Sequence, residues 1–173
     1  MQLTPETAMM MRGMLLSGAD REQGTTAKVI SAIPNQNRDY KPDPKSKTAM
    51  DLASHIAQAD VMFLDGIAAG AFEPASRQKA PVGATTPELI AWYNTTYKES
   101  SAKVANLDPH ALMKVIDFHG IVQMPAVMYL TFLNNHMIHH RGQLSTYLRA
   151  MGGKCPSIYG PSADEEMMAA GAP

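Results

Sequence analysis

The order of apolar and polar residues along the chain predicts helices and no extended sheet. Strict alternation of apolar and polar positions, which is typical of a half-buried strand, is not sustained anywhere in the sequence. Four segments instead have the residues that begin and end helices, namely 4–33, 48–70, 86–107 and 124–151. Four helices without a sheet predict an all-α fold, a four-helix bundle.

The ends of these segments carry specific helix-terminal residues. Thr4-Pro5-Glu6 and Thr86-Pro87-Glu88 each place a capping hydroxyl before a proline and an acidic residue of the first turn. Thr48 precedes Asp51 by three residues, as in a capping box, and Gly152-Gly153 supplies the last C-cap. Within the first segment, the polar and glycine-bearing stretch 18–26 leaves room for a break.

The connections bear on topology and on domain count. Residues 34–47 and 71–85 are long loops for antiparallel neighbours, so a crossover is an alternative to a simple up-and-down order. Residues 114–118 form either a short strand or one more helical turn. At 173 residues one domain is expected. We place the bundle at 1–165 and a flexible C-terminal tail at 166–173.

Composition excludes several function classes. Fifteen basic and sixteen acidic residues leave a net charge of −1, which lacks the basic surface that binds nucleic acid or an anionic membrane. Aromatic residues make up only 6% and methionines number 14, a balance that favours helices over β-sandwiches. We therefore expect a small-molecule partner, no nucleic acid and no membrane.

The cysteine count and the N-terminus indicate a compartment. Cys155 is the single cysteine, so no intramolecular disulfide can form and a reducing environment is expected. The N-terminal residues lack the basic region of a signal peptide. The uncharged run 118–140 has too short an apolar part for a membrane span, which needs about 20 residues. These features predict a cytoplasmic protein.

Two histidines one turn apart suggest a metal site. His136 and His140 lie about 40° apart around a helix of about 100° per residue. Their Cβ atoms should be about 5–6 Å apart, which lets two imidazoles meet at one ion. His140 faces the apolar side of its helix, His136 lies at the edge of that side, and His139 lies on the flank. The alternative is that each is an ordinary histidine bonded to a carbonyl or to water.

His55 is the candidate third ligand, because it lies toward the apolar face of the second helix. Three imidazoles from two helices would leave a coordination position open, as in catalytic rather than structural zinc sites. Zinc, nickel, copper or ferrous iron suit such ligands, whereas calcium and magnesium do not. His110 and His119 lie at helix or loop junctions and are weaker candidates.

The surrounding residues resemble a known family. His136-x-x-x-His140-Arg141-Gly142-Gln143-Leu144, followed by Tyr147-Leu148-Arg149 and preceded far upstream by His55, resembles the DinB/YfiT-like superfamily of metal-binding bundles. Residues 40–49 and 159–165 extend the resemblance to its first loop and its usual ending. The resemblance implies an up-down-down-up bundle, a homodimer, and His55, His136 and His140 as ligands of zinc or nickel.

Members with known activity include thiol S-transferases that use bacterial low-molecular-weight thiols and a mycothiol-dependent maleylpyruvate isomerase. The resemblance therefore implies a metal-dependent transferase or hydrolase that activates a thiol or water and takes an electrophilic substrate. The alternative is a non-catalytic bundle with a structural or regulatory ion. Gln143, Tyr147 and Gln58 could orient ligands or substrate. Asp51 is the nearest acid to His55 in sequence and fits a helix cap better than a general base.

Overall fold

Four long helices dominate the molecule in the computed structural model, which describes residues 3–74 and 77–165. Their bounds are α1 Pro5–Ser31, α2 Ala49–Ala69, α3 Thr86–Ala105 and α5 Tyr129–Ala150. The first is continuous, so no break occurs within 18–26. The hydroxyls of Thr4 and Thr48 each accept a backbone N–H of the first turn, as the sequence predicts, whereas α3 is capped by Thr85 and not by the predicted Thr86.

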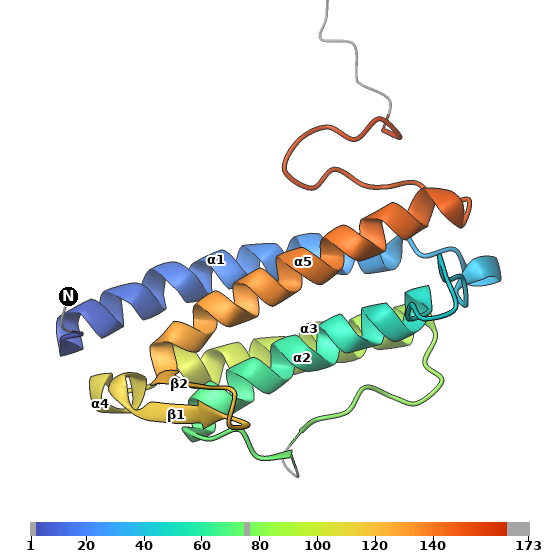
Figure 1. Ribbon diagram of the computed structural model, residues 1–173. Helices are drawn as coiled ribbons and strands as arrows, with labels where there is room; N and C mark the ends of the chain where they lie inside the picture. Colours follow the sequence, from blue (N-terminus) through green and yellow to red (C-terminus); the bar gives the residue numbers. More distant parts are fainter. Residues whose placement is uncertain (1–2, 75–76, 166–173) are drawn as a thin grey trace, which may run out of the picture.

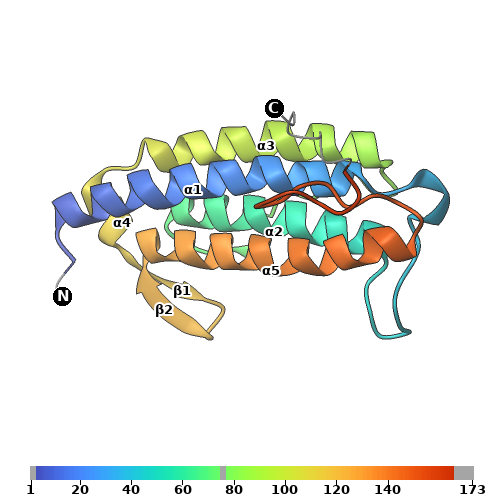
Figure 2. The same cartoon turned by 90° about the horizontal axis from the view of Figure 1, so that it is seen from above.

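The helices form a bundle in which α1 and α5 run in one direction and α2 and α3 in the other (Figures 1 and 2). Each helix packs against two neighbours: α5 lies between α1 and α2, and α3 lies beside α2 and α1. This is the up-down-down-up order, and the predicted four-helix bundle is confirmed. Because α2 and α3 are parallel, Ala69 and Thr86 lie at opposite ends of the bundle, which explains the long connection between them (Figure 1).

A small hairpin precedes the last long helix. It follows helix α4 (Pro109–Met113) and pairs β1 (Val115–Phe118) with β2 (Val122–Pro125) in an antiparallel register. His119 and Gly120 make its turn with φ angles of 55° and 73°, the left-handed region that hairpin turns require. Of the two structures predicted for residues 114–118, a strand or a helical turn, the strand is therefore the one that forms.

The predicted start of the last helix at 124 is wrong. Met124-Pro125 belongs to β2, the 3-10 turn Ala126–Met128 follows, and α5 begins at Tyr129. A proline is accepted at the end of an edge strand as readily as at a helix start, so the dipeptide is ambiguous in sequence. A second short 3-10 turn, Asn35–Asn37, lies in the loop after α1.

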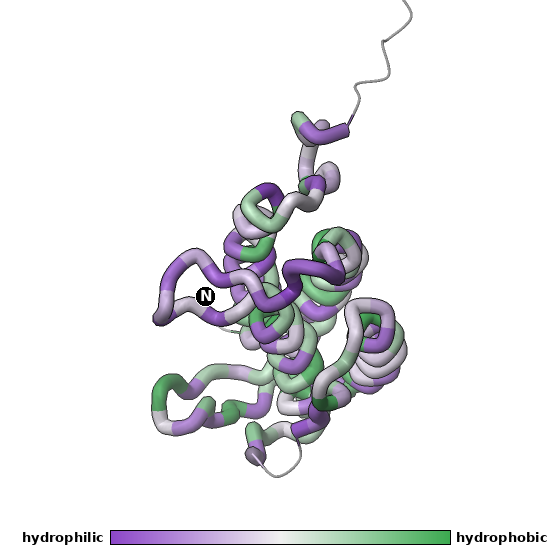
Figure 3. Tube along the Cα trace, turned by 90° about the vertical axis from the view of Figure 1, so that its right-hand side faces the viewer, coloured by the Kyte–Doolittle hydropathy of each residue, from purple (hydrophilic) through white to green (hydrophobic). Residues whose placement is uncertain are grey.

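The core lies between the four helices, which Figure 3 views end-on. Each helix contributes fully buried aliphatic side chains, among them Ile30, Ile56, Leu89 and Leu144. Burying one such side chain stabilises the fold by about 1.5–3 kcal/mol, so this apolar interior fixes which helix faces meet. It also fixes the pairing of α2 with α5, which carries the site.

Among the described residues, no helix is long and apolar enough to cross a membrane. The predicted flexible tail, 166–173, lies outside the described residues. The flexibility of this tail and the end of the bundle at residue 165 therefore stay predictions.

Candidate metal centre

Three imidazoles meet where α2 packs against α5. His55 lies in the second turn of α2, and His136 and His140 lie one turn apart on α5. The Nε2 atom of His55 is 3.2 Å from Nε2 of His136 and 3.3 Å from Nε2 of His140. All three rings offer a nitrogen within 4.8 Å of the others, so together they could hold a metal ion.

Hydrogen bonds between the rings account for this arrangement only in part. A ring nitrogen carries at most one hydrogen, so Nε2 of His55 can donate to one of its neighbours but not to both. Nitrogens bonded at about 2.0–2.1 Å to one tetrahedral ion lie about 3.3–3.4 Å from each other. The two separations from His55, 3.2 and 3.3 Å, are close to that spacing, as expected of ligands that share one tetrahedral cation.

The environment keeps these imidazoles uncharged. Burial and, after it, the positive charge that the neighbouring histidines would carry lower the pKa of His55 to about 4. Burial likewise lowers the pKa of His136 to about 4 and lowers that of His140. Neutral imidazole is the form that binds metal, so at neutral pH the site does not need to lose a proton from these rings first.

The second nitrogen of His140 has a defined partner. Its Nδ1 lies 2.7 Å from Oε1 of Gln143, one turn along the same helix. Because an amide oxygen only accepts, Nδ1 donates and the lone pair of His140 is left on Nε2, toward the other rings. Of the three residues expected to orient ligands, Gln143 makes this contact. Tyr147 packs edge-on against Tyr40 instead, and Gln58 donates to Ser54 O.

Asp60 is a neighbour of the centre that sequence reasoning missed. It is fully buried, its Oδ2 accepts the hydroxyl of Tyr93 at 2.5 Å, and its Oδ1 lies 3.8 Å from Nδ1 of His136. Neither Oδ1 nor that Nδ1 has a hydrogen-bond partner. Burial raises the pKa of Asp60 well above its usual value. The signal in the sequence is a carboxylate on the helix face that carries Ile56 and Leu64, where an apolar residue is expected.

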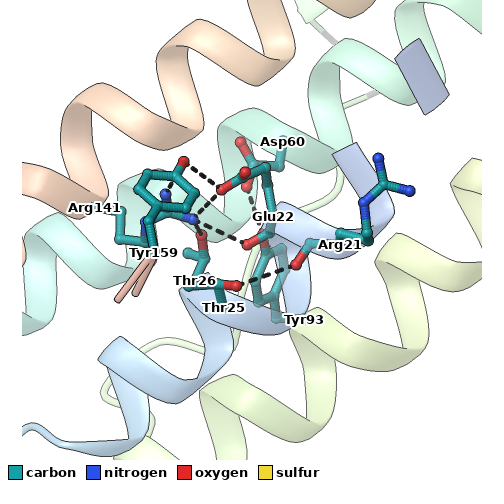
Figure 4. A network of polar contacts seen from close by, with 8 residues as sticks. All are labelled: Arg21, Glu22, Thr25, Thr26, Asp60, Tyr93, Arg141 and Tyr159. Carbon is teal, nitrogen blue, oxygen red and sulfur yellow. Dashed lines mark hydrogen bonds and ion pairs between the residues drawn. The ribbon is translucent and has the colours of Figure 1, made fainter. Parts of the chain in front are cut away.

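Arg141, next to His140 in the sequence, bonds residues of α1 and of the chain after α5 and none of the three clustered histidines. It is 1% exposed, and its Nη1 donates to Oε2 of Glu22 on α1 at 2.5 Å and to Thr26 at 3.4 Å. Its Nη2 donates to the hydroxyl of Tyr159 at 2.5 Å, and that hydroxyl also bonds Glu22. Figure 4 shows this network, which links α5 to α1 and to the chain after α5.

A cavity of about 960 Å³ opens beside the histidines. One face of α2 and one face of α5 form two of its walls, and the crossover loop and the hairpin add residues from the other sides. Its lining residues are Lys47, Asp51, Ser54, His55, Gln58, Ala59, Met62, Phe63, Arg77, Gln78, Lys79, Phe118, Phe132, Asn135, His136 and His139. Two of the three clustered histidines therefore border open space.

The remaining histidines lie outside the cluster. His139 is exposed, and its ring centre is 4.8 Å from that of His140. His119, in the hairpin turn, contacts Arg77 through Nε2 at 3.0 Å. His110 lies in the short helix α4. Asp51 is a first-turn residue of α2 whose backbone N–H donates to the hydroxyl of Thr48, so the cap of this helix is Thr48 and not Asp51.

Comparison with known proteins supplies the family. The DinB family model matches residues 9–169, nearly the whole chain. The chain belongs to the DinB family. It is 28% identical over 148 residues to the uncharacterized protein YrdA of Bacillus subtilis, which covers 83% of this chain and 85% of YrdA. It is 27% identical over 134 residues to the uncharacterized protein YjoA of the same organism, covering 75% of this chain and 84% of YjoA.

Solved structures of DinB-like proteins share the fold. The crystal structure of YjoA from B. subtilis matches with a TM-score of 0.68 at 24% identity, over 80% of this chain and 92% of that one. A DinB-like protein from Bacillus cereus matches with a TM-score of 0.70 at 24% identity, over 84% and 95%. At this identity the two structures support the helical bundle, not a reaction.

Proposed function

We propose that this DinB-family protein binds one divalent metal ion, zinc or nickel, through Nε2 of His55, His136 and His140, and uses it to activate a thiol or water toward an electrophilic small molecule. The observation that carries the proposal is the spacing of the three nitrogens at the wall of a cavity. An all-imidazole donor set suits zinc and nickel and disfavours calcium and magnesium.

The ion would supply a Lewis acid that lowers the pKa of a thiol or water entering its open position. The protein's own residues hold the donors ready for it. Burial keeps the rings of His55 and His136 neutral, and the amide of Gln143 holds the hydrogen of His140 on Nδ1. Because three protein ligands leave a tetrahedral ion one position short, a ligand in the cavity can complete it.

A second candidate function is a structural ion without turnover. It is favoured by one observation: the three histidines come from two helices that pack against each other, so an ion would cross-link α2 to α5. Both functions require metal, and they differ in whether the open position is used for chemistry.

Elemental analysis of untagged protein tests the metal. We expect about one zinc or nickel per chain in the wild type and in His139→Ala, and a loss of most of that metal in His140→Ala. The His139→Ala variant is the matched control, because it removes an exposed imidazole next to the site. Full metal content in purified His140→Ala would refute the ligand assignment.

A panel of low-molecular-weight thiols with a chromogenic electrophile then tests the chemistry. The catalytic proposal predicts turnover that is lost on chelation, restored by metal, and absent from His140→Ala. Metal-loaded wild type that gives no turnover with any thiol, and none in a matching hydrolysis panel, would favour the structural ion.

A further inference from the structure

The cavity beside the histidines has an excess of positive charge. Lys47, Arg77 and Lys79 line it, and among the described lining residues Asp51 is the single acid. The whole chain has a net charge of −1, so this charge is local. Asp65, which lies nearby, already accepts hydrogen bonds from Lys103, Ser100 and Gln78. A cleft with low-dielectric walls concentrates the field of such cations on a bound ligand.

The same cavity has an aromatic end. Phe63 and Phe118 stack with ring centres 5.5 Å apart, and the ring of Phe63 also approaches His136 at 5.9 Å. Phe132 lines the cavity and is 42% exposed, a large apolar surface left to water. A ligand that covers Phe132 would gain the free energy of removing that surface from water. Aromatic side chains, cations and two of the clustered histidines thus line the same space.

We infer that the cavity binds an organic anion with an aromatic or branched aliphatic body, its carboxylate directed to Lys47, Arg77 or Lys79 and its body on Phe63, Phe118 and Phe132. This inference rests on the proposed function, because His55 and His136 line the same cavity, so a ligand bound there would lie beside the proposed metal. It names the substrate class of that site.

Matched ligands test it on the full-length protein. The affinities of 3-phenylpropionate, its neutral amide 3-phenylpropionamide, and propionate are measured by calorimetry, with zinc-loaded and with chelator-treated protein. We expect phenylpropionate to bind at least tenfold more tightly than either analogue in both forms. Lys79→Gln and Arg77→Gln should each weaken phenylpropionate about three- to tenfold. Lys98→Gln, on the exposed face of α3, is the charge-matched control and should not.

Equal binding of the amide would overturn the role of charge, and equal binding of propionate would overturn the role of the aromatic end. The chelator-treated arm separates the two proposals. If the protein takes up no metal but still prefers phenylpropionate, the anion site stands and the metal-based function fails. If metal binds and no carboxylate is preferred in either form, the anion site fails alone.

A different observation carries a second inference, about Asp60. Two buried polar atoms without partners, Oδ1 of Asp60 and Nδ1 of His136, face each other at 3.8 Å. An unpaired buried polar atom is costly, and two such atoms of complementary type side by side are rare in native proteins. A shift of about 1 Å would bring them to hydrogen-bond length.

The geometry assigns Asp60 as a positioning residue that accepts the Nδ1 hydrogen of His136 when Nε2 binds the metal. A histidine ligand commonly donates its other nitrogen to a carboxylate, which fixes the tautomer and the ring orientation. Tyr93 in turn holds the opposite oxygen of the carboxylate at 2.5 Å. The amide oxygen of Gln143 accepts the Nδ1 hydrogen of His140 in the same way. Both ligands on α5 would then have a fixed tautomer. This inference also rests on the metal site.

The test compares Asp60→Asn with Tyr93→Phe, which removes the hydrogen bond at the other carboxylate oxygen. Asp60→Asn should weaken zinc binding about 10- to 100-fold and change the absorption of the cobalt-substituted protein, while Tyr93→Phe, which leaves the carboxylate in place, should weaken it less than Asp60→Asn does. Nitrogen-15 NMR of zinc-loaded wild type should show the His136 hydrogen on Nδ1. If Asp60→Asn binds zinc as tightly as wild type, the assignment is refuted, whereas absence of zinc binding in the wild type would refute the metal site itself.

Discussion

Replacing Arg141 by methionine should destabilise the bundle and leave its metal content unchanged. The guanidinium is 1% exposed and bonds Glu22, Thr26 and Tyr159 at distances from 2.5 to 3.4 Å. None of these partners is one of the clustered histidines. Methionine keeps much of the side-chain volume, so the loss is mainly that of the polar contacts.

Its magnitude follows from the burial of the two charges. Breaking a buried ion pair costs about 3–5 kcal/mol, because one charge is left without a partner. The Glu22 side chain is 17% exposed and can regain part of its hydration, so we expect about 2–3 kcal/mol for Arg141→Met. At about 2–4 °C per kcal/mol for a chain of this size, the melting temperature should fall by roughly 5–10 °C.

A double-mutant cycle with Glu22→Gln isolates the pair. Both single variants and the double variant are unfolded by urea at pH 7 with metal removed, and the coupling free energy is taken from the cycle. We expect the double variant to be less destabilised than the sum of the single ones by about 1–3 kcal/mol. A coupling near zero would mean that the pair behaves as an exposed surface bridge and that the structural reasoning about Arg141 is wrong.

Three further predictions concern pH and helix geometry. Metal-free protein should lose stability as the pH falls from about 6.5 toward 4, because His55 and His136 take up protons at a higher pH in the unfolded chain than in the folded one. The melting temperature should therefore fall less over this pH range in His55→Gln than in the wild type. The same fall in both proteins would contradict this prediction. Gly66→Ala should destabilise by about 1–3 kcal/mol, since the new methyl group would clash with a neighbouring phenylalanine ring, whereas Gly24→Ala, which meets no atom, should stabilise α1 by about 0.5–1 kcal/mol in urea unfolding. Thr85→Ala should cost about 1 kcal/mol by removing the cap of α3, checked by the same assay.

Local signals in the sequence were sufficient for the long helices and insufficient for the hairpin. A helix of twenty residues repeats its apolar spacing several times and has a cap at each end, so an error at one position does not hide it. The strands Val115–Phe118 and Val122–Pro125 are four residues each, too short for a period of two to be distinguished from a helical turn. Gly120 marks the turn at His119 in the sequence, but one turn signal does not say that strands flank it.

The cluster of histidines could be anticipated because it depends on angles within single helices. His136 and His140 share a face by spacing alone, and His55 lies on the apolar side of its own helix. That these two faces meet depends on which helices are neighbours, which only the fold decides. The partners from other helices, Asp60 with Tyr93 on α3, could not be paired from spacing, although the charged residue on an apolar face was visible.

The crossover between α2 and α3 is what makes room for the site. In a simple up-and-down bundle, short turns join antiparallel neighbours and no connection runs the length of the bundle. Here α2 and α3 are parallel, so the chain must return along the outside, and it carries Arg77, Gln78 and Lys79 past the α2–α5 face that holds His55 and His136. Gln78 anchors that return to α2 through Asp65 at 2.7 Å. The topology therefore supplies two parts of the cavity: two antiparallel helices that bring the imidazoles together, and a loop that places Arg77, Gln78 and Lys79 beside them.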